Sequence, residues 1–171
     1  MIDLPYTPLI TPLAAIEAMD LLTITDMISS ETDPSRRHDD WHPAYPREDD
    51  LDGVGMVTDL TGWTSRQIRR LADGLVVGSI GFFGPPDDVD GTPEVEVGYG
   101  LVAEARGQGL MREVLPAVLT MTDTVGVRVR ASTTYDNAAS LASLRGAGFV
   151  VRSEDPDDLD RQVVLVRELP A

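Results

Sequence analysis

The chain has 171 residues, 42% hydrophobic and 25% charged, which is enough for one compact domain with a substantial core. Fourteen basic and 29 acidic residues give a net charge of −15, so the surface repels nucleic acids and anionic membranes. It would attract cations such as amines, with the alternative that the acidity only keeps the protein soluble. The absence of cysteine excludes disulfides, thiolate catalysis and cysteine metal sites.

The first fifty residues predict a strand, a helix and a loop. Thr7–Leu13 is a short strand that Pro8 and Pro12 restrict to a sheet edge or a strand end. Apolar residues near helical spacing predict a helix over Ala14–Ile28. Ser30–Asp50 is polar and contains prolines, so it predicts a surface loop of the kind that covers a binding site.

This loop contains both histidines of the chain. His38 and His42 have the spacing of two metal ligands on one helical face, but Pro43 ends any turn there, so we expect no metal site. Trp41 and Tyr45 fit better as the lining of an acceptor site, with loop packing as the alternative.

The middle of the chain predicts a weak helix followed by three antiparallel strands. The strands alternate with turns, and the first two strands meet at the hairpin signal Asp73-Gly74. In the third strand Val95, Val97, Tyr99 and Leu101 share one face, and Glu94, Glu96 and Gly98 share the other. The expected ranges are Leu51–Trp63 for the helix, Gln67–Leu71, Leu75–Phe83 and Glu94–Val102 for the strands, and Gly84–Gly91 for the acidic turn.

A glycine-rich turn, Arg106-Gly107-Gln108-Gly109-Leu110-Met111, joins the third strand to a helix. Backbone N–H groups at such a turn point in one direction, and the helix dipole adds positive charge at the same point. The pattern therefore predicts a phosphate-binding turn. The alternative is a helix start with an incidental pair of glycines.

The last third alternates helices with strands. We expect helices over Leu110–Thr122, bent at Pro116, and from an N-cap at Asn137 to Gly146. The expected strands are Val125–Ser132, Phe149–Arg152 and Gln162–Arg167, with an acidic turn over Glu154–Asp160.

Two segments resemble the GCN5-related N-acetyltransferase (GNAT) superfamily. Glu96-Val97-Gly98-Tyr99 and the glycine turn are similar to its fourth strand and acetyl-CoA pyrophosphate loop, and Asn137-Ala138-Ala139-Ser140 with Gly148-Phe149 is similar to its Asn-x-x-Ser helix. Ser140 and Glu-x-Gly-Tyr look most like the RimJ/RimL branch. The resemblance covers Leu75–Leu169. It implies an α+β (mixed α/β) GNAT-like fold over residues 1–171 as a single domain. In that fold a mixed, mostly antiparallel sheet is splayed between its fourth and fifth strands and flanked by about four helices.

The resemblance implies acetyl-CoA as cosubstrate. The turn would bind the pyrophosphate, the end of the third strand would pair with the pantetheine amides, Asn137 would bond the pantetheine arm, and Ser140 would lie near the sulfur. The implied cofactor-binding residues are Leu101, Val102, Ala103, Arg106, Gly107, Gln108, Gly109, Leu110, Met111, Asn137 and Ser140. Two positions depart from the family: Met111 replaces a usual glycine or alanine, and Leu144 replaces a tyrosine acid.

An amine acceptor must lose a proton before it attacks the thioester, because its ordinary pKa is about 10. Glu96 is the expected general base, since the family's base occupies that strand position. Glu94, two residues away, would hold the cationic acceptor or merely line the sheet. A backbone N–H near Val102 would stabilise the oxyanion, and Ser140 is the expected donor to the leaving thiolate, with Tyr135 as a more distant candidate.

Two other functions remain as alternatives. A nicotinamide-dependent oxidoreductase is disfavoured because Arg112 replaces the third glycine of its fingerprint. A non-enzymatic acyl-CoA-binding protein on a degenerate GNAT fold is compatible with Met111 and Leu144. For the favoured enzyme we expect a cationic amine acceptor, no nucleic acid or membrane partner and a cytoplasmic location; a homodimer is left open.

Overall fold

The computed structural model describes Leu4 and residues 7–55, 62–154 and 162–170. Its main elements form one large sheet with helices on both faces. In chain order they are β1 (Leu9–Ile10), β2 (Ala14–Ala18), α1 (Leu21–Ser29), η1 (Pro34–Arg36), α2 (Glu48–Gly55), β3 (Arg66–Arg70), β4 (Val76–Phe82), β5 (Asp87–Val89), β6 (Thr92–Leu101), η2 (Ala103–Ala105), α3 (Leu110–Thr124), β7 (Arg128–Thr134), α4 (Ala138–Gly146), β8 (Val150–Glu154) and β9 (Gln162–Arg167).

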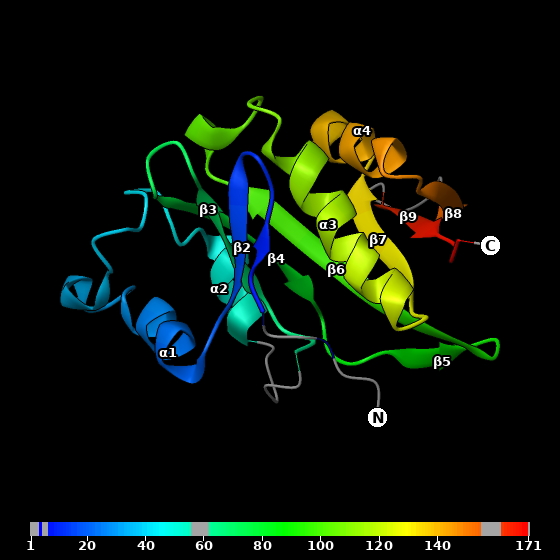
Figure 1. Ribbon diagram of the computed structural model, residues 1–171, viewed down its shortest axis with the longest axis horizontal. Helices are drawn as coiled ribbons and strands as arrows, with labels where there is room; N and C mark the ends of the chain where they lie inside the picture. The colour runs from blue at the N-terminus through cyan, green and yellow to red at the C-terminus, as the bar shows by residue number, and fades with distance from the viewer. Residues whose placement is uncertain (1–3, 5–6, 56–61, 155–161, 171) are drawn as a thin grey trace.

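The strand order is β1-β2-β3-β4-β6-β7-β9-β8, and β5 pairs with the start of β6. The pairing of β6 with β7 is parallel and the other pairings are antiparallel, as the expected mixed, mostly antiparallel sheet requires. Figure 1 shows α3 and α4 in front of the sheet and α2 behind it. No described helix is long and apolar enough to span a membrane.

The expected helix over Ala14–Ile28 is wrong in its first part. Ala14–Ala18 forms β2, and its first three side chains are buried between β1 and β3. The helix begins only at Leu21, where Asp20 caps it by accepting a hydrogen bond from the Thr23 N–H. Burial in the sheet therefore overrode the helical preference of the alanines.

Other element predictions were closer. The meander strands, the helix after the glycine turn and the helix capped by Asn137 are confirmed with shifts of a few residues. The acidic run Gly84–Gly91 is not only a turn, because it contains β5, which pairs with β6. Pro116 lies inside the continuous helix α3. The helix expected over Leu51–Trp63 is α2, which starts earlier, at Glu48. Residues 56–61 of the expected range and the acidic turn at 155–160 lie outside the described part.

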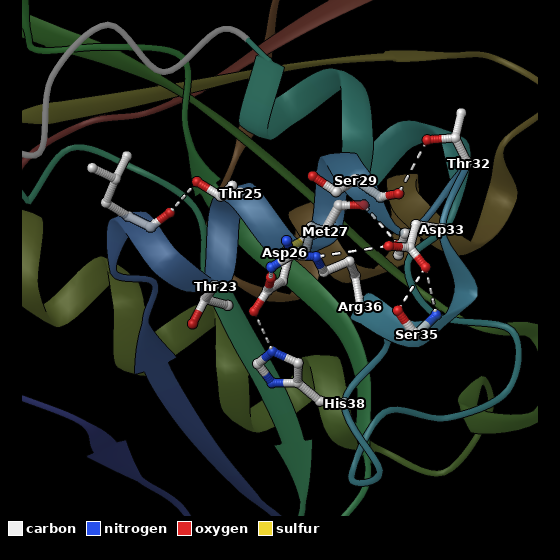
Figure 2. Close-up of polar contacts among 12 residues, drawn as sticks. Thr23, Thr25, Asp26, Met27, Ser29, Thr32, Asp33, Ser35, Arg36 and His38 are labelled. Carbon is white, nitrogen blue, oxygen red and sulfur yellow. Dashed lines mark hydrogen bonds and ion pairs between the residues drawn. The ribbon is translucent and has the colours of Figure 1, made fainter.

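Polar contacts fasten the loop after α1 to that helix (Figure 2). His38 lies with its Nε2 atom 3.0 Å from Asp26, and Arg36 reaches the other carboxylate oxygen at 3.3 Å. The contact with His38 is the main cause that lowers the pKa of Asp26. The His38 ring also stacks on Trp41, with 4.4 Å between ring centroids. The loop is thus a packed part of the fold.

Candidate active site

The sheet opens between β6 and β7. These parallel strands pair only from Glu94 opposite Arg128 to Glu96 opposite Arg130. Beyond that point β6 continues to Leu101 and stays paired with β4, and β7 continues to Thr134 paired with β9. The two strands therefore diverge, which confirms the expected splay.

A cavity of 460 Å³ occupies this opening. Residues of α2 line one end and residues of α4 line the other, so the cavity connects the two faces of the sheet. Its lining includes, from β6, Glu96–Tyr99; from β7, residues 131–133; from α4 and its cap, Asn137, Ser140 and Leu144; and from α2 and its approach, Arg47, Asp49, Asp52 and Gly53.

Glu96 lies on the cavity wall at the point where the strands part. Its carboxylate is 3.1 Å from the Arg130 guanidinium, and 22% of its side chain is exposed. The same face of β6 continues as Gly98 and Gly100, where an added Cβ would collide with the Phe83 ring and the Arg47 guanidinium. The two glycines thus let the Phe83 ring and the Arg47 guanidinium approach the strand closely, at Gly98 and Gly100.

Glu94 does not line the cavity, contrary to the expectation for it. Its side chain is 1% exposed and is held by Arg152, at 2.7 and 2.5 Å, and by Arg128, at 2.7 Å. The hydrogen bonds from Arg152 are the main cause that lowers the pKa of Glu94. The expectation that Glu94 holds the acceptor is contradicted, because both its oxygens already bind guanidinium groups that join β6 to β7 and β8.

Trp41 and Tyr45 do not reach the cavity either. Trp41 is 4% exposed and Tyr45 is fully buried, and neither belongs to the cavity lining. The two rings pack edge to face, 5.6 Å apart, and Tyr45 contacts the sulfur of Met27. Their burial contradicts the prediction that they enclose an amine, and the alternative of loop packing holds.

Ser140 and Tyr99 meet on the α4 side of the opening. Asn137 caps α4 by accepting the Ser140 N–H at 3.1 Å, which fixes Ser140 in the first turn. Tyr99 places its hydroxyl 3.1 Å from Oγ of Ser140, and burial raises the pKa of the phenol. Tyr99 was not predicted as a site residue, because the alternation along β6 assigned it to the face of core residues. Leu144 lines the same cavity and is 1% exposed.

The glycine turn has the geometry of an anion cradle. Gly107 and Gly109 have φ angles of +73° and +82°, which L side chains rarely adopt, and an added Cβ at Gly107 would meet open space. Within the described part of the chain, no group accepts a hydrogen bond from the backbone N–H groups of residues 107–111. Met111 packs its side chain against the core and so does not crowd the turn.

The backbone near Val102 departs from the sequence prediction. Its N–H donates to the carbonyl of Val77 at 2.8 Å, so it does not point into the opening. Because the N–H and C=O directions alternate along a strand, the corresponding groups of Tyr99 and Leu101, which lie beyond the last bridge to β7, point away from β4 and toward the opening. The Leu101 carbonyl already accepts a hydrogen bond from Nε of Arg106 at 3.1 Å.

His38 and His42 make other contacts in the fold. His38 contacts Asp26, and Nδ1 of His42 accepts a hydrogen bond from the Ala44 N–H. Across the described residues, no three His, Cys, Asp or Glu side chains come together as a metal site would require.

Sequence analysis also missed the α2 wall of the cavity. Arg47 binds Asp50 at 2.7 Å, and Ser79 of β4 donates a short hydrogen bond to the same buried carboxylate. This contact holds the start of α2 and the segment before it against β4. Asp49 and Asp52 of α2 then line the cavity. The only sequence signal was the acidic run at 48–50, which favours the N-terminus of a helix.

The comparisons with known proteins agree with this geometry. A family model described as "Acetyltransferase (GNAT) domain" matches residues 14–150. A search of curated proteins finds no match. A GnaT-family acetyltransferase structure from Bordetella pertussis is 22% identical, with a TM-score of 0.65 over 94% of this chain and 99% of its own.

Two further solved structures share the fold at lower identity. The ribosomal-protein-S5-alanine acetyltransferase from Vibrio fischeri is 13% identical, with a TM-score of 0.66 over 95% of this chain and 96% of its own. RimL, a ribosomal L7/L12 α-N-protein acetyltransferase in complex with coenzyme A, is 17% identical, with a TM-score of 0.63 over 98% of both chains.

Proposed function

Because the chain belongs to the GNAT acetyltransferase family, we propose that it moves the acetyl group of acetyl-CoA to a primary amine within a ternary complex, using residues 1–171 as one catalytic domain. The observation that carries the proposal is the cavity at the point where β6 and β7 part. Glu96 lies at its wall on the α2 face and Ser140 on the α4 face. An amine and a thioester entering from opposite faces would meet there.

The glycine turn would hold the pyrophosphate of acetyl-CoA. Its N–H groups at residues 107–111 have no acceptor among the described residues, and Gly107 leaves open space beside them. Farther along, the strand edge from Val97 to Leu101 would pair with the pantetheine amides. Asn137 and Ser140 would lie beside the end of that arm.

Glu96 would act as the general base. Its carboxylate would accept the proton that the ammonium loses, directly or through a water molecule, so that the neutral amine can attack the acetyl carbonyl. Arg130 would hold the carboxylate in place by their 3.1 Å ion pair. The oxyanion would be stabilised by an N–H of the β6 edge, at Tyr99 or Leu101, in place of that of Val102.

The acceptor would carry positive charge. Among the described residues of the cavity lining, Asp49, Asp52 and Glu96 outnumber the single cation Arg47, which is itself paired with Asp50. The Glu-x-Gly-Tyr and Asn-x-x-Ser segments and the two ribosomal-protein acetyltransferase neighbours favour the RimJ/RimL branch. A protein α-amine is then one acceptor class, with small-molecule amines as the other.

A panel of amines tests the proposal. The protein is incubated with acetyl-CoA and peptides with free N-termini, polyamines, amino acids or aminoglycosides, and release of free thiol is followed. We expect turnover with a cationic amine and a new amide in the product by mass spectrometry. Thiol release at the rate of uncatalysed hydrolysis with every amine would contradict the proposal.

A further inference from the structure

Tyr99 and Ser140 form a hydroxyl pair that no local sequence contact explains. They are 41 positions apart, on β6 and α4, and both line the cavity. The phenol oxygen lies 3.1 Å from Oγ of Ser140 and 3.4 Å from the Ser140 carbonyl oxygen. The pair therefore depends on the way the fold sets α4 against the open edge of β6.

Either hydroxyl of the pair can be the donor in this contact. Both acceptors near the Tyr99 hydroxyl belong to Ser140, whose N–H is committed to Asn137. When Tyr99 donates to Oγ, the proton of the Ser140 hydroxyl is free to point into the cavity. Hydrogen bonds in such a chain polarise one another, so the serine becomes a stronger donor.

Tyr99 is suited to donate a hydrogen bond without giving up its proton. Burial raises the pKa of this phenol above its ordinary value of about 10, whereas a cysteine thiol, the protein group most like that of coenzyme A, has an ordinary pKa of about 8.5. A thiolate therefore does not remove the proton from Tyr99. The pair would stabilise an anion on sulfur through hydrogen bonding.

We propose that Tyr99 is a positioning residue for the leaving group, because it directs the Ser140 hydroxyl toward the sulfur of coenzyme A as the carbon–sulfur bond breaks. This inference rests on the proposed function. The amine that Glu96 has deprotonated forms the new C–N bond, its nitrogen releases a second proton to solvent, and the electrons of the C–S bond leave on sulfur. Ser140 hydrogen-bonds that thiolate until solvent protonates it. Leu144, at the position of the family's tyrosine acid, has no polar atom that could do so.

The complex with coenzyme A alone tests the pair without any acceptor. The thiolate absorbs in the ultraviolet, so a pH titration of the complex gives the pKa of the bound thiol. Tyr99→Phe keeps the ring and removes the donor, so the midpoint should rise by about one pH unit, a tenfold loss of thiolate stabilisation. Ser140→Ala should raise it further, and Tyr99→Phe should add nothing in the Ser140→Ala background.

Ser143→Ala is the matched control, because it removes an exposed hydroxyl from the same helix that bonds only the Ala139 carbonyl among the described residues. Its titration should equal that of the wild type. A Tyr99→Phe complex that also titrates like the wild type, or effects that add in the double variant, would overturn the role of Tyr99. Thermal melting checks that each variant is folded.

Kinetics give an independent second measurement. Tyr99→Phe should lower kcat roughly tenfold, the effect of losing one hydrogen bond to a charged group, and leave the KM for acetyl-CoA unchanged. An unchanged kcat would overturn the inference. Failure of the wild type to bind coenzyme A would overturn the proposed function as well, whereas binding with an unmoved thiol titration would count against Tyr99 alone.

Discussion

Single residues two positions apart on one strand have different roles in this protein. Glu94 and Glu96 share a face of β6, and each pairs with an arginine directly opposite on β7. Glu94 is closed off by a second arginine from β8, whereas Glu96 borders the cavity. Only Glu96 is therefore placed to exchange a proton with a substrate.

Replacing Glu96 by glutamine should lower kcat by about 10²–10⁴, the usual contribution of a general base, and leave acetyl-CoA affinity unchanged. The loss should shrink at high pH, where the amine is neutral without help. Initial rates across pH and calorimetry with acetyl-CoA measure both effects. Glu168→Gln, with a side chain 64% exposed, is the control. A variant that keeps the pH–rate profile of the wild type would remove Glu96 from this role.

Replacing Glu94 by glutamine should destabilise the fold by about 3 kcal/mol at neutral pH, because two guanidinium groups lose a buried partner. The lowered pKa of Glu94 means that its stabilisation is present above the ordinary carboxyl pKa and is lost as the pH falls through the folded value. The difference in unfolding free energy between variant and wild type should therefore shrink on acidification. Urea titrations at a series of pH values measure it, and a constant difference would contradict the ion-pair account.

Among the elements, the turn before α3 is the one whose backbone we propose to bind acetyl-CoA. Gly109→Ala should weaken acetyl-CoA binding at least roughly tenfold in calorimetry, because a side chain at φ +82° would disturb the N–H groups proposed to bind the phosphates. Gly126→Ala is the matched control. Gly126 has a φ of +70° and open space around an added Cβ, but it follows the other end of α3. Equal affinities for the two variants would place the cradle elsewhere.

The loop between α1 and α2 acts as packing. Trp41→Ala should cost about 3–5 kcal/mol of stability, the usual range for removing a buried tryptophan, because Trp41 packs on both His38 and Tyr45. At a temperature where the variant is folded, the KM for the acceptor should equal that of the wild type. Chemical denaturation and initial rates test the two parts. A raised KM with unchanged stability would restore this loop as the acceptor wall.

At the scale of the whole molecule, charge and the cavity act together. The net charge of −15 and the carboxylates of the cavity wall would attract the proposed cationic acceptor, and salt screens such attraction. The KM of the acceptor should therefore rise with ionic strength, while acetyl-CoA affinity, set mainly by backbone N–H groups, should change less. Asp52→Asn should reduce the salt dependence. An acceptor KM insensitive to salt would mean that the acidity serves solubility only.

The position and type of those elements whose signals are local could be predicted from the sequence alone. The glycine turn, the Asn137 cap, the meander and the helices after them follow from nearby residues that set backbone conformation, and these segments also carry the family resemblance. Tertiary structure decided the rest. Ala14–Ala18 became a strand because β1 and β3 flank it, and Val102 gave its N–H to Val77. The surroundings of the Glu94, Trp41 and Tyr99 side chains depended on partners far away in sequence. Burial and pairing are set by the whole sheet and not by the spacing of residues along one segment.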